Sequence, residues 1–102
     1  MMKQTEILVI CTHQEILNTI VRLINSNSEL HGIGANTLEQ AITLFKATAF
    51  DMVLVGAGLA ENEETELAGV VNKLSLAVPV VHHYGGGSGL LFAEIYQCLG
   101  KR

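Results

Sequence analysis

Short apolar runs rich in β-branched residues alternate along this chain with longer segments whose apolar residues recur at helical spacing. This alternation occurs four times, and it is typical of βα units, in which crossover helices join parallel strands. Strands of a parallel sheet are buried on both faces, so they appear as unbroken apolar runs. The pattern therefore predicts an α/β domain built on four parallel strands.

Residues that favour turns separate the expected elements. Gly32 and Gly34 weaken the second strand, and Pro79 falls among the first residues of the fourth, where a missing backbone donor is tolerated. Asn36 or Thr37 is expected to cap the second helix. The expected strands are residues 6–11, 30–35, 50–55 and 78–82.

The helical segments each carry an apolar stripe that we expect to face the sheet. The first helix covers residues 14–27, the third begins in a run of glutamates near Glu61, and the last covers about residues 90–99 before Gly100. Carboxylates are favoured at a helix start, so we interpret the glutamates as a solvated helix start rather than a metal site. The expected stripes are Ile16, Leu17, Ile20, Val21, Leu23 and Ile24; Leu38, Ala41, Ile42 and Phe45; Leu67, Val70, Val71 and Leu74; and Leu91, Ile95, Cys98 and Leu99.

Length and charge narrow the class of protein. The 102 residues suffice for a single domain, residues 1–102, and 49% of them are hydrophobic. The net charge is −4 and the six Lys and Arg residues are scattered, which argues against a nucleic-acid partner. The first apolar run is too short for a signal peptide or a membrane span. Cys11 and Cys98 lack motif spacing, so we expect reduced thiols and a cytoplasmic location.

Four stretches together resemble the receiver domain of bacterial response regulators. The first strand ends at Cys11-Thr12, where that family has an acidic pair. Residues 35–41 resemble the entry to its second helix, residues 51–56 its third strand, and residues 78–81 its fourth. The resemblance implies a three-layer flavodoxin-like sandwich, a parallel sheet of order 2-1-3-4 with helices on both faces.

The departures from the family pattern lie at its chemical positions. Phosphotransfer to a receiver needs a carboxylate nucleophile after the third strand and acidic ligands for magnesium. Gly56 stands at the nucleophile position, and Cys11-Thr12 replaces the acidic pair. One βα unit is missing after Tyr84, so the family's switch lysine has no counterpart. We therefore expect a non-catalytic receiver-like interaction or small-ligand module of the bacterial cytoplasm, with an unknown protein partner, without cofactors and without phosphorylation.

Ligands of open parallel sheets bind at the carboxyl ends of the strands. One cysteine and three histidines fall there, which raises zinc or copper as an alternative to a polar loop rim. His82 and His83 are adjacent on a strand and should face opposite ways, which disfavours a shared metal ion. The expected strand-end pocket consists of Cys11, Thr12, His13, Gly56, His82, His83 and Tyr84.

A glycine-rich turn precedes the last helix. Its backbone amides could converge on a small anion with the helix dipole behind them, and a hydroxyl could assist or cap the helix. The alternative is a tight turn that needs several positive φ values. The turn consists of Gly85, Gly86, Gly87, Ser88 and Gly89.

Cys11 also allows a second functional class. The IIB components of the sugar phosphotransferase system are similar in length and carry a phosphorylated cysteine after the first strand. Their next loop is rich in Gly and Ser, whereas here Thr12, His13, Gln14 and Glu15 follow, with a carboxylate where an anion should bind. We keep a IIB-like phosphocarrier as the alternative function.

The last helix carries a second apolar stripe, formed by Phe92 and Tyr96 at a spacing of four. We expect this stripe to lack a partner within one small domain, and the fourth strand to be an open sheet edge. Both features favour a two-fold homodimer built on the last helix and the fourth strand.

Overall fold

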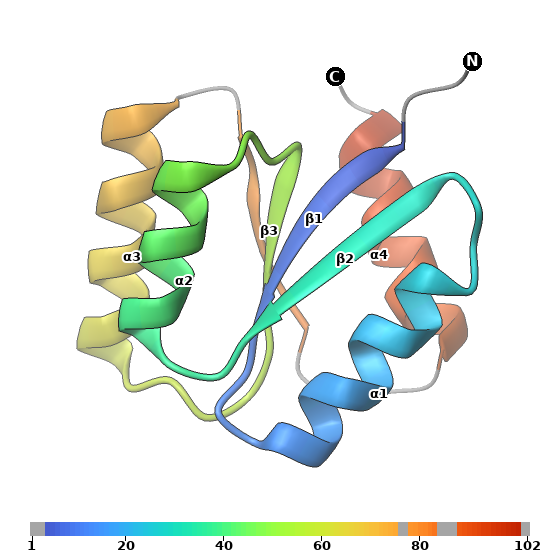
Figure 1. Ribbon diagram of the computed structural model, residues 1–102, viewed down its shortest axis with the longest axis horizontal. Helices are drawn as coiled ribbons and strands as arrows, with labels where there is room; N and C mark the ends of the chain where they lie inside the picture. Colours follow the sequence, from blue (N-terminus) through green and yellow to red (C-terminus); the bar gives the residue numbers. More distant parts are fainter. Residues whose placement is uncertain (1–3, 76–77, 84–87, 101–102) are drawn as a thin grey trace.

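The computed structural model describes residues 4–75, 78–83 and 88–100. They form a four-stranded parallel sheet of order β2-β1-β3-β4 with two helices on each face (Figure 1). The predicted fold class and strand order are confirmed. The elements are β1 (Thr5–Ile10), α1 (Gln14–Asn25), β2 (Leu30–Ala35), α2 (Leu38–Ala47), β3 (Met52–Val55), α3 (Glu61–Leu74), β4 (Val80–His82) and α4 (Ser88–Gly100).

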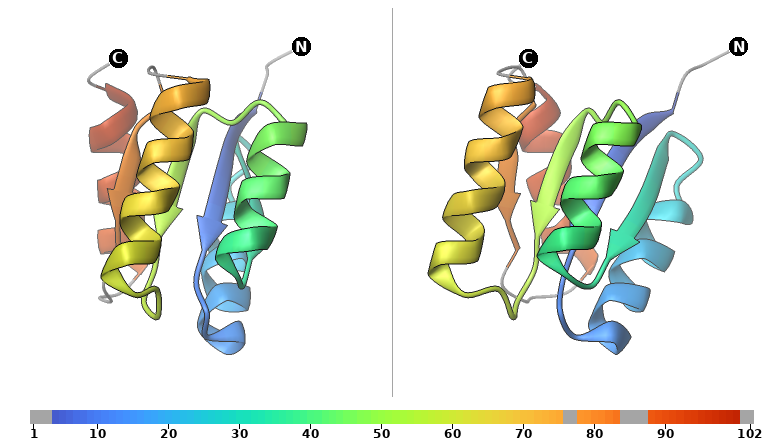
Figure 2. Two further views of the ribbon diagram at one scale, coloured as in Figure 1. Left: turned by 90° about the vertical axis from the view of Figure 1, so that its left-hand side faces the viewer. Right: turned by 60° about the vertical axis from the view of Figure 1, so that its left-hand side comes forward.

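Successive residues of the central strands enter two different cores. Ile7 and Val9 of β1 belong to the core under α1 and α4, whereas Leu8 and Ile10 belong to the core under α2 and α3. The two helix pairs lie on opposite sides of the sheet in all three views (Figures 1 and 2). Burial on both faces explains why β1 and β3 appear as unbroken apolar runs.

The terminal helix α4 lies on the same face as α1, whereas α2 and α3 cover the other (Figure 1). Leu91 and Ile95 of α4 are fully or almost fully buried in the core that α1 also covers, as predicted for that stripe. Crossover helices have a fixed hand, so a helix that led to a further strand beyond β4 would lie beside α3. In the described part of the chain α4 leads to no such strand, and it completes the cover of the α1 face instead.

Two residues assigned to buried helix stripes are exposed, so that part of the prediction is wrong. Ile16 is 48% exposed because it lies in the first turn of α1, ahead of the buried Leu17, Ile20 and Ile24. Leu74 is 51% exposed, because it is the last residue of α3, three positions after the buried Val71.

Several element boundaries differ from the prediction by a few residues. Helix α1 ends at Asn25, and β4 has only three residues, although the Pro79 carbonyl still accepts a hydrogen bond from Val53 N at 2.9 Å. Helix α4 begins at Ser88 and includes Gly100. No helix in the described ranges is long and apolar enough to cross a membrane.

One side chain caps the start of α2, and another covers part of a sheet edge. Thr37 Oγ1 accepts from Gln40 N at 3.1 Å, which confirms Thr37 as the cap of α2. At the open edge of β2, the Asn25 amide takes the place of a neighbouring strand. Its Oδ1 accepts from Gly32 N at 2.8 Å and its Nδ2 donates to Gly32 O at 3.2 Å. Both backbone groups that this glycine directs away from β1 are therefore occupied, which protects the edge from pairing with another strand.

Candidate functional site

The carboxyl ends of β1, β3 and β4 meet at one edge of the sheet, as the sequence predicts. Backbone hydrogen bonds continue past the strands there: Gly56 N donates to Ile10 O at 2.8 Å, and His83 N donates to Val55 O at 2.8 Å. Thr12 N donates to Ala57 O at 3.3 Å. The residues after β1, β3 and β4 are therefore tied to one another by their backbones.

Cys11 and Gly56 pack directly against each other at this edge. Cys11 is fully buried, and its thiol lies 3.7 Å from the His13 carbonyl, the acceptor it faces. A Cβ atom at Gly56 would lie 3.1 Å from the Cys11 Cβ and 3.4 Å from its Sγ. A longer side chain at position 56 therefore requires Cys11 to move.

Thr12 closes the next part of the edge by packing on Gly58. Gly58 has φ +109°, a conformation that favours glycine. A Cβ there would lie 1.7 Å from Thr12 Oγ1 and 2.9 Å from Thr12 Cβ, which no real contact allows. The loop after β3 therefore takes this path only because residue 58 has no side chain.

His13 is exposed, and its backbone carbonyl takes part in the first turn of α1. It is the N-cap residue of α1, and its carbonyl accepts from Leu17 N at 2.9 Å. Its side chain makes no capping hydrogen bond.

The two adjacent histidines at the end of β4 point to opposite faces, as predicted. His82 Nε2 lies 2.9 Å from Glu64 Oε1 of α3, and both side chains are partly exposed. His83 Nδ1 hydrogen-bonds Oε1 of Glu94 in α4, and the His83 side chain is only 6% exposed. Each histidine thus ties the end of β4 to the helix that covers its own face.

The described strand-end residues are not grouped as the ligands of a metal ion would be. In the part of the chain that the structure describes, no three His, Cys, Asp or Glu side chains are grouped as metal ligands would be. Tyr84 and Gly85–Gly87 lie outside the described residues, while Ser88 and Gly89 are the first residues of α4. The predicted anion site at the glycine-rich turn therefore stays a prediction.

A hollow of about 480 Å³ lies beside this edge, between the first turns of α2 and α3. Its lining includes the carboxylates of Glu39, Glu63 and Glu66 together with Leu38 and Ile42. Their negative charge disfavours an anionic ligand there.

Phe92 and Tyr96 have partners inside the domain, which corrects the reason given for the homodimer. Their rings stack with centroids 6.5 Å apart. Phe92 also packs against the core under α1, and the Tyr96 hydroxyl accepts a hydrogen bond from Asn27 Nδ2 at 2.5 Å. Tyr96 is still 42% exposed. The dimer interface at these two residues stays a prediction.

Sequence reasoning missed Glu94, and it placed Gly58 at this edge without predicting its contact with Thr12. Glu94 carried a readable signal, because it lies on the same side of its helix as Leu91, Ile95 and Cys98, and a carboxylate within an apolar stripe needs a partner. Gly58 carried none beyond its place in a Gly-Ala-Gly turn, since its φ value and its contact with Thr12 arise only in the folded chain.

Known proteins resemble this chain in structure but not detectably in sequence. No family model and no curated protein matches the sequence. The signal receiver domain of an HD domain-containing protein from Pseudomonas fluorescens Pf-5 has a TM-score of 0.83 at 16% identity, over 97% of both chains. A CheY-like response regulator receiver domain protein from Methanospirillum hungatei JF-1 has a TM-score of 0.79 at 16% identity, over 97% of this chain and 96% of the other. The chain has the receiver-domain fold.

A third receiver domain, from Clostridium thermocellum, has a TM-score of 0.76 at 14% identity over 95% of both chains. The receiver fold that the strand ends and spacing implied is thus confirmed. Cys11, Thr12 and Gly56 lie at the carboxyl edge of its sheet. The IIB-like alternative gains no support, and the Cys11 thiol that it requires is fully buried.

Proposed function

We propose that this chain is a non-catalytic receiver-like signalling module that acts through protein contacts and is not phosphorylated at the receiver position. The observation that carries the proposal is the packing of the carboxyl edge. Cys11 fills the space in front of Gly56, and Thr12 fills the space in front of Gly58. Neither pair offers the carboxylate nucleophile or the oxygen ligands for magnesium that phosphotransfer requires.

The remaining surface favours protein partners over other ligands. The chain is acidic, which disfavours nucleic acid, and its described metal-ligating residues are dispersed. We further propose a bacterial cytoplasmic location, a two-fold homodimer through Phe92 and Tyr96, and an optional small anion at residues 85–89. These three points rest on the sequence arguments.

Treatment with acetyl phosphate and magnesium tests the central proposal. Intact-mass spectrometry should show no phosphoryl adduct under conditions that modify an ordinary receiver domain. Gly56→Asp is the matched variant: it restores a carboxylate, but Cys11 and Thr12 still provide no magnesium site, so it should also stay unmodified. An adduct on the unaltered chain, mapped to a residue at the strand ends, would overturn the proposal. An adduct on Gly56→Asp alone would show that only the nucleophile is missing.

A further inference from the structure

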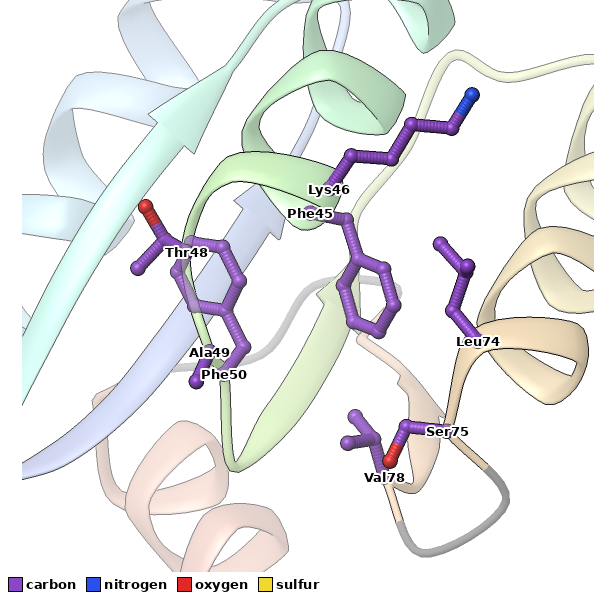
Figure 3. A pocket seen from close by; sticks show the side chains of 8 residues that line it. All are labelled: Phe45, Lys46, Thr48, Ala49, Phe50, Leu74, Ser75 and Val78. Atoms are coloured by element: carbon purple, nitrogen blue, oxygen red, sulfur yellow. The ribbon is translucent and has the colours of Figure 1, made fainter.

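A second hollow, of about 400 Å³, lies at the amino end of the sheet, opposite the candidate site. It is formed where the last turns of α2 and α3 flank the segments that enter β3 and β4 (Figure 3). We call it the amino-end hollow. Its lining residues are Phe45, Lys46, Thr48, Ala49, Phe50, Leu74, Ser75 and Val78.

The inner lining of the amino-end hollow is apolar and firmly held. Phe45 and Phe50 are 7% and 6% exposed, and their rings stack with centroids 6.2 Å apart and an interplanar angle of 13°. Leu74 extends from α3 toward Phe45 of α2 (Figure 3). It is 51% exposed, the highest value among the large hydrophobic residues that the structure describes as exposed. An apolar side chain of suitable size would find a preformed contact surface here.

The lysines of α2 and α3 lie at the same end of the molecule as the amino-end hollow. Lys46 and Lys73 lie in the last turns of α2 and α3, while the glutamates of these helices are gathered toward their first turns. Lys46 is one of the lining residues, and its side chain extends from α2 away from the Phe45 and Phe50 rings, with the ammonium group at its far end (Figure 3). Within the described residues no ion pair engages either lysine. A partner with carboxylates therefore meets Lys46 in the lining and Lys73 beside Leu74 in the last turn of α3, while the Asp51 carboxyl accepts a hydrogen bond from Glu6 N at 2.8 Å.

We propose that the amino-end hollow docks a peptide segment of a partner protein in which a large apolar side chain lies next to Asp or Glu. The apolar residue fills the hollow over Phe45, Phe50 and Leu74, and the carboxylates pair with Lys46 and Lys73. Two lysines beside an apolar surface suit such a segment better than a nucleic acid, which requires a broader basic surface. The inference rests on the proposed function, because it names the partner class of an interaction module.

Selection from a random peptide library displayed on phage tests this inference with the full chain as the target. Enriched peptides should combine an aromatic or large aliphatic residue with nearby acidic residues. Their affinity should fall by about tenfold or more for the double variant Lys46→Gln with Lys73→Gln, because the charge pairing is lost. Arg22→Gln is the matched control: it removes a positive charge from α1, outside the hollow, and should change affinity by less than about twofold.

Changes in backbone amide chemical shifts on peptide binding show where the peptide binds. Changes confined to the lining of the amino-end hollow support the inference. Enriched peptides that lack acidic residues, or that bind the lysine variant equally well, overturn it, and so does an absence of enrichment. Peptides that bind at another surface overturn the inference about the amino-end hollow, but they leave the proposal of an interaction module standing. Light scattering that shows self-association abolished by the lysine variant would make the occupant a second copy, which also overturns the inference.

Discussion

A hollow lies between α2 and α3 at each end of the parallel sheet, but the two ends differ in how tightly the segments next to the strands are packed. At the carboxyl end, Thr12 lies against Gly58 and Cys11 against Gly56, so that even a methyl group lacks room at Gly58. At the amino end, the last turns of α2 and α3 stand apart over a hollow of about 400 Å³, and Leu74 remains half exposed beside it.

This difference bears on where in the molecule a binding site should be sought. Ligands of open α/β sheets bind where the strands end, because loops and helix starts converge there. Among the described residues of that edge, Cys11 packs against Gly56 and Thr12 against Gly58, and the hollow beside them is lined in part by glutamates. The amino-end hollow lies at the other end and has two phenylalanines in its lining. Function therefore has to be argued from the site itself rather than from the fold.

The largest change in the free energy of unfolding is expected when the close contacts at the carboxyl end are disturbed. Gly58→Ala should reduce the free energy of unfolding by about 3 kcal/mol or more, because it combines an unfavourable positive φ with a direct clash on Thr12. Urea denaturation followed by circular dichroism measures the loss. If the variant is as stable as the original chain, the carboxyl end is not packed as described.

Two matched variants divide this effect into its causes. Gly58→Ala combined with Thr12→Ala removes the 1.7 Å clash and should recover part of the lost stability, leaving the cost of the backbone conformation. Gly69→Ala is the control, because this glycine lies in α3 with nothing within 4 Å of an added Cβ. It should stabilise the chain by up to about 1 kcal/mol through helix propensity.

Repeating patterns could be predicted from the sequence, whereas contacts between distant segments, such as that of Gly58, could not. The fold class and most of the buried stripes follow from periodicity, because burial on two faces or on one stripe imposes a repeating pattern. The opposite directions of His82 and His83 follow from the same rule. The strand order followed instead from the resemblance to receiver domains. Side-chain partners between distant segments do not follow, because each depends on how two elements are positioned. The partners of both histidines and the contact between Thr12 and Gly58 are of this kind.

Helix ends were the other source of error. Ile16 and Leu74 fit apolar stripes by spacing, yet both are about half exposed. A stripe is buried only where the sheet lies beneath it, and the first and last turns of a helix can project beyond that area. The amino-end hollow follows from this effect at Leu74, so spacing alone could not have predicted it.

A smaller effect is expected at the histidine pairs of the carboxyl end. Glu94→Ala should reduce the free energy of unfolding by about 2 kcal/mol, because it removes the hydrogen-bond partner of the buried His83. Glu64→Ala is the matched control, since its partner His82 is 40% exposed and water can replace the carboxylate. That change should stay within about 0.5 kcal/mol. Equal losses for both variants, measured by urea denaturation, would mean that His83 is as open to water as His82.

The smallest change in the free energy of unfolding is expected at the amino end. It tests whether Leu74 is needed for the stability of the fold. Leu74→Ala should change the free energy of unfolding by less than about 0.5 kcal/mol, because half of this side chain already contacts water. Leu67→Ala in the same helix should cost about 3 kcal/mol, because Leu67 is fully buried in the core under α2 and α3. Thermal and urea denaturation of the two variants under identical conditions measure this difference. A loss at Leu74 comparable to that at Leu67 would show that the leucine supports the fold, and the amino end would then be closed by packing as the carboxyl end is.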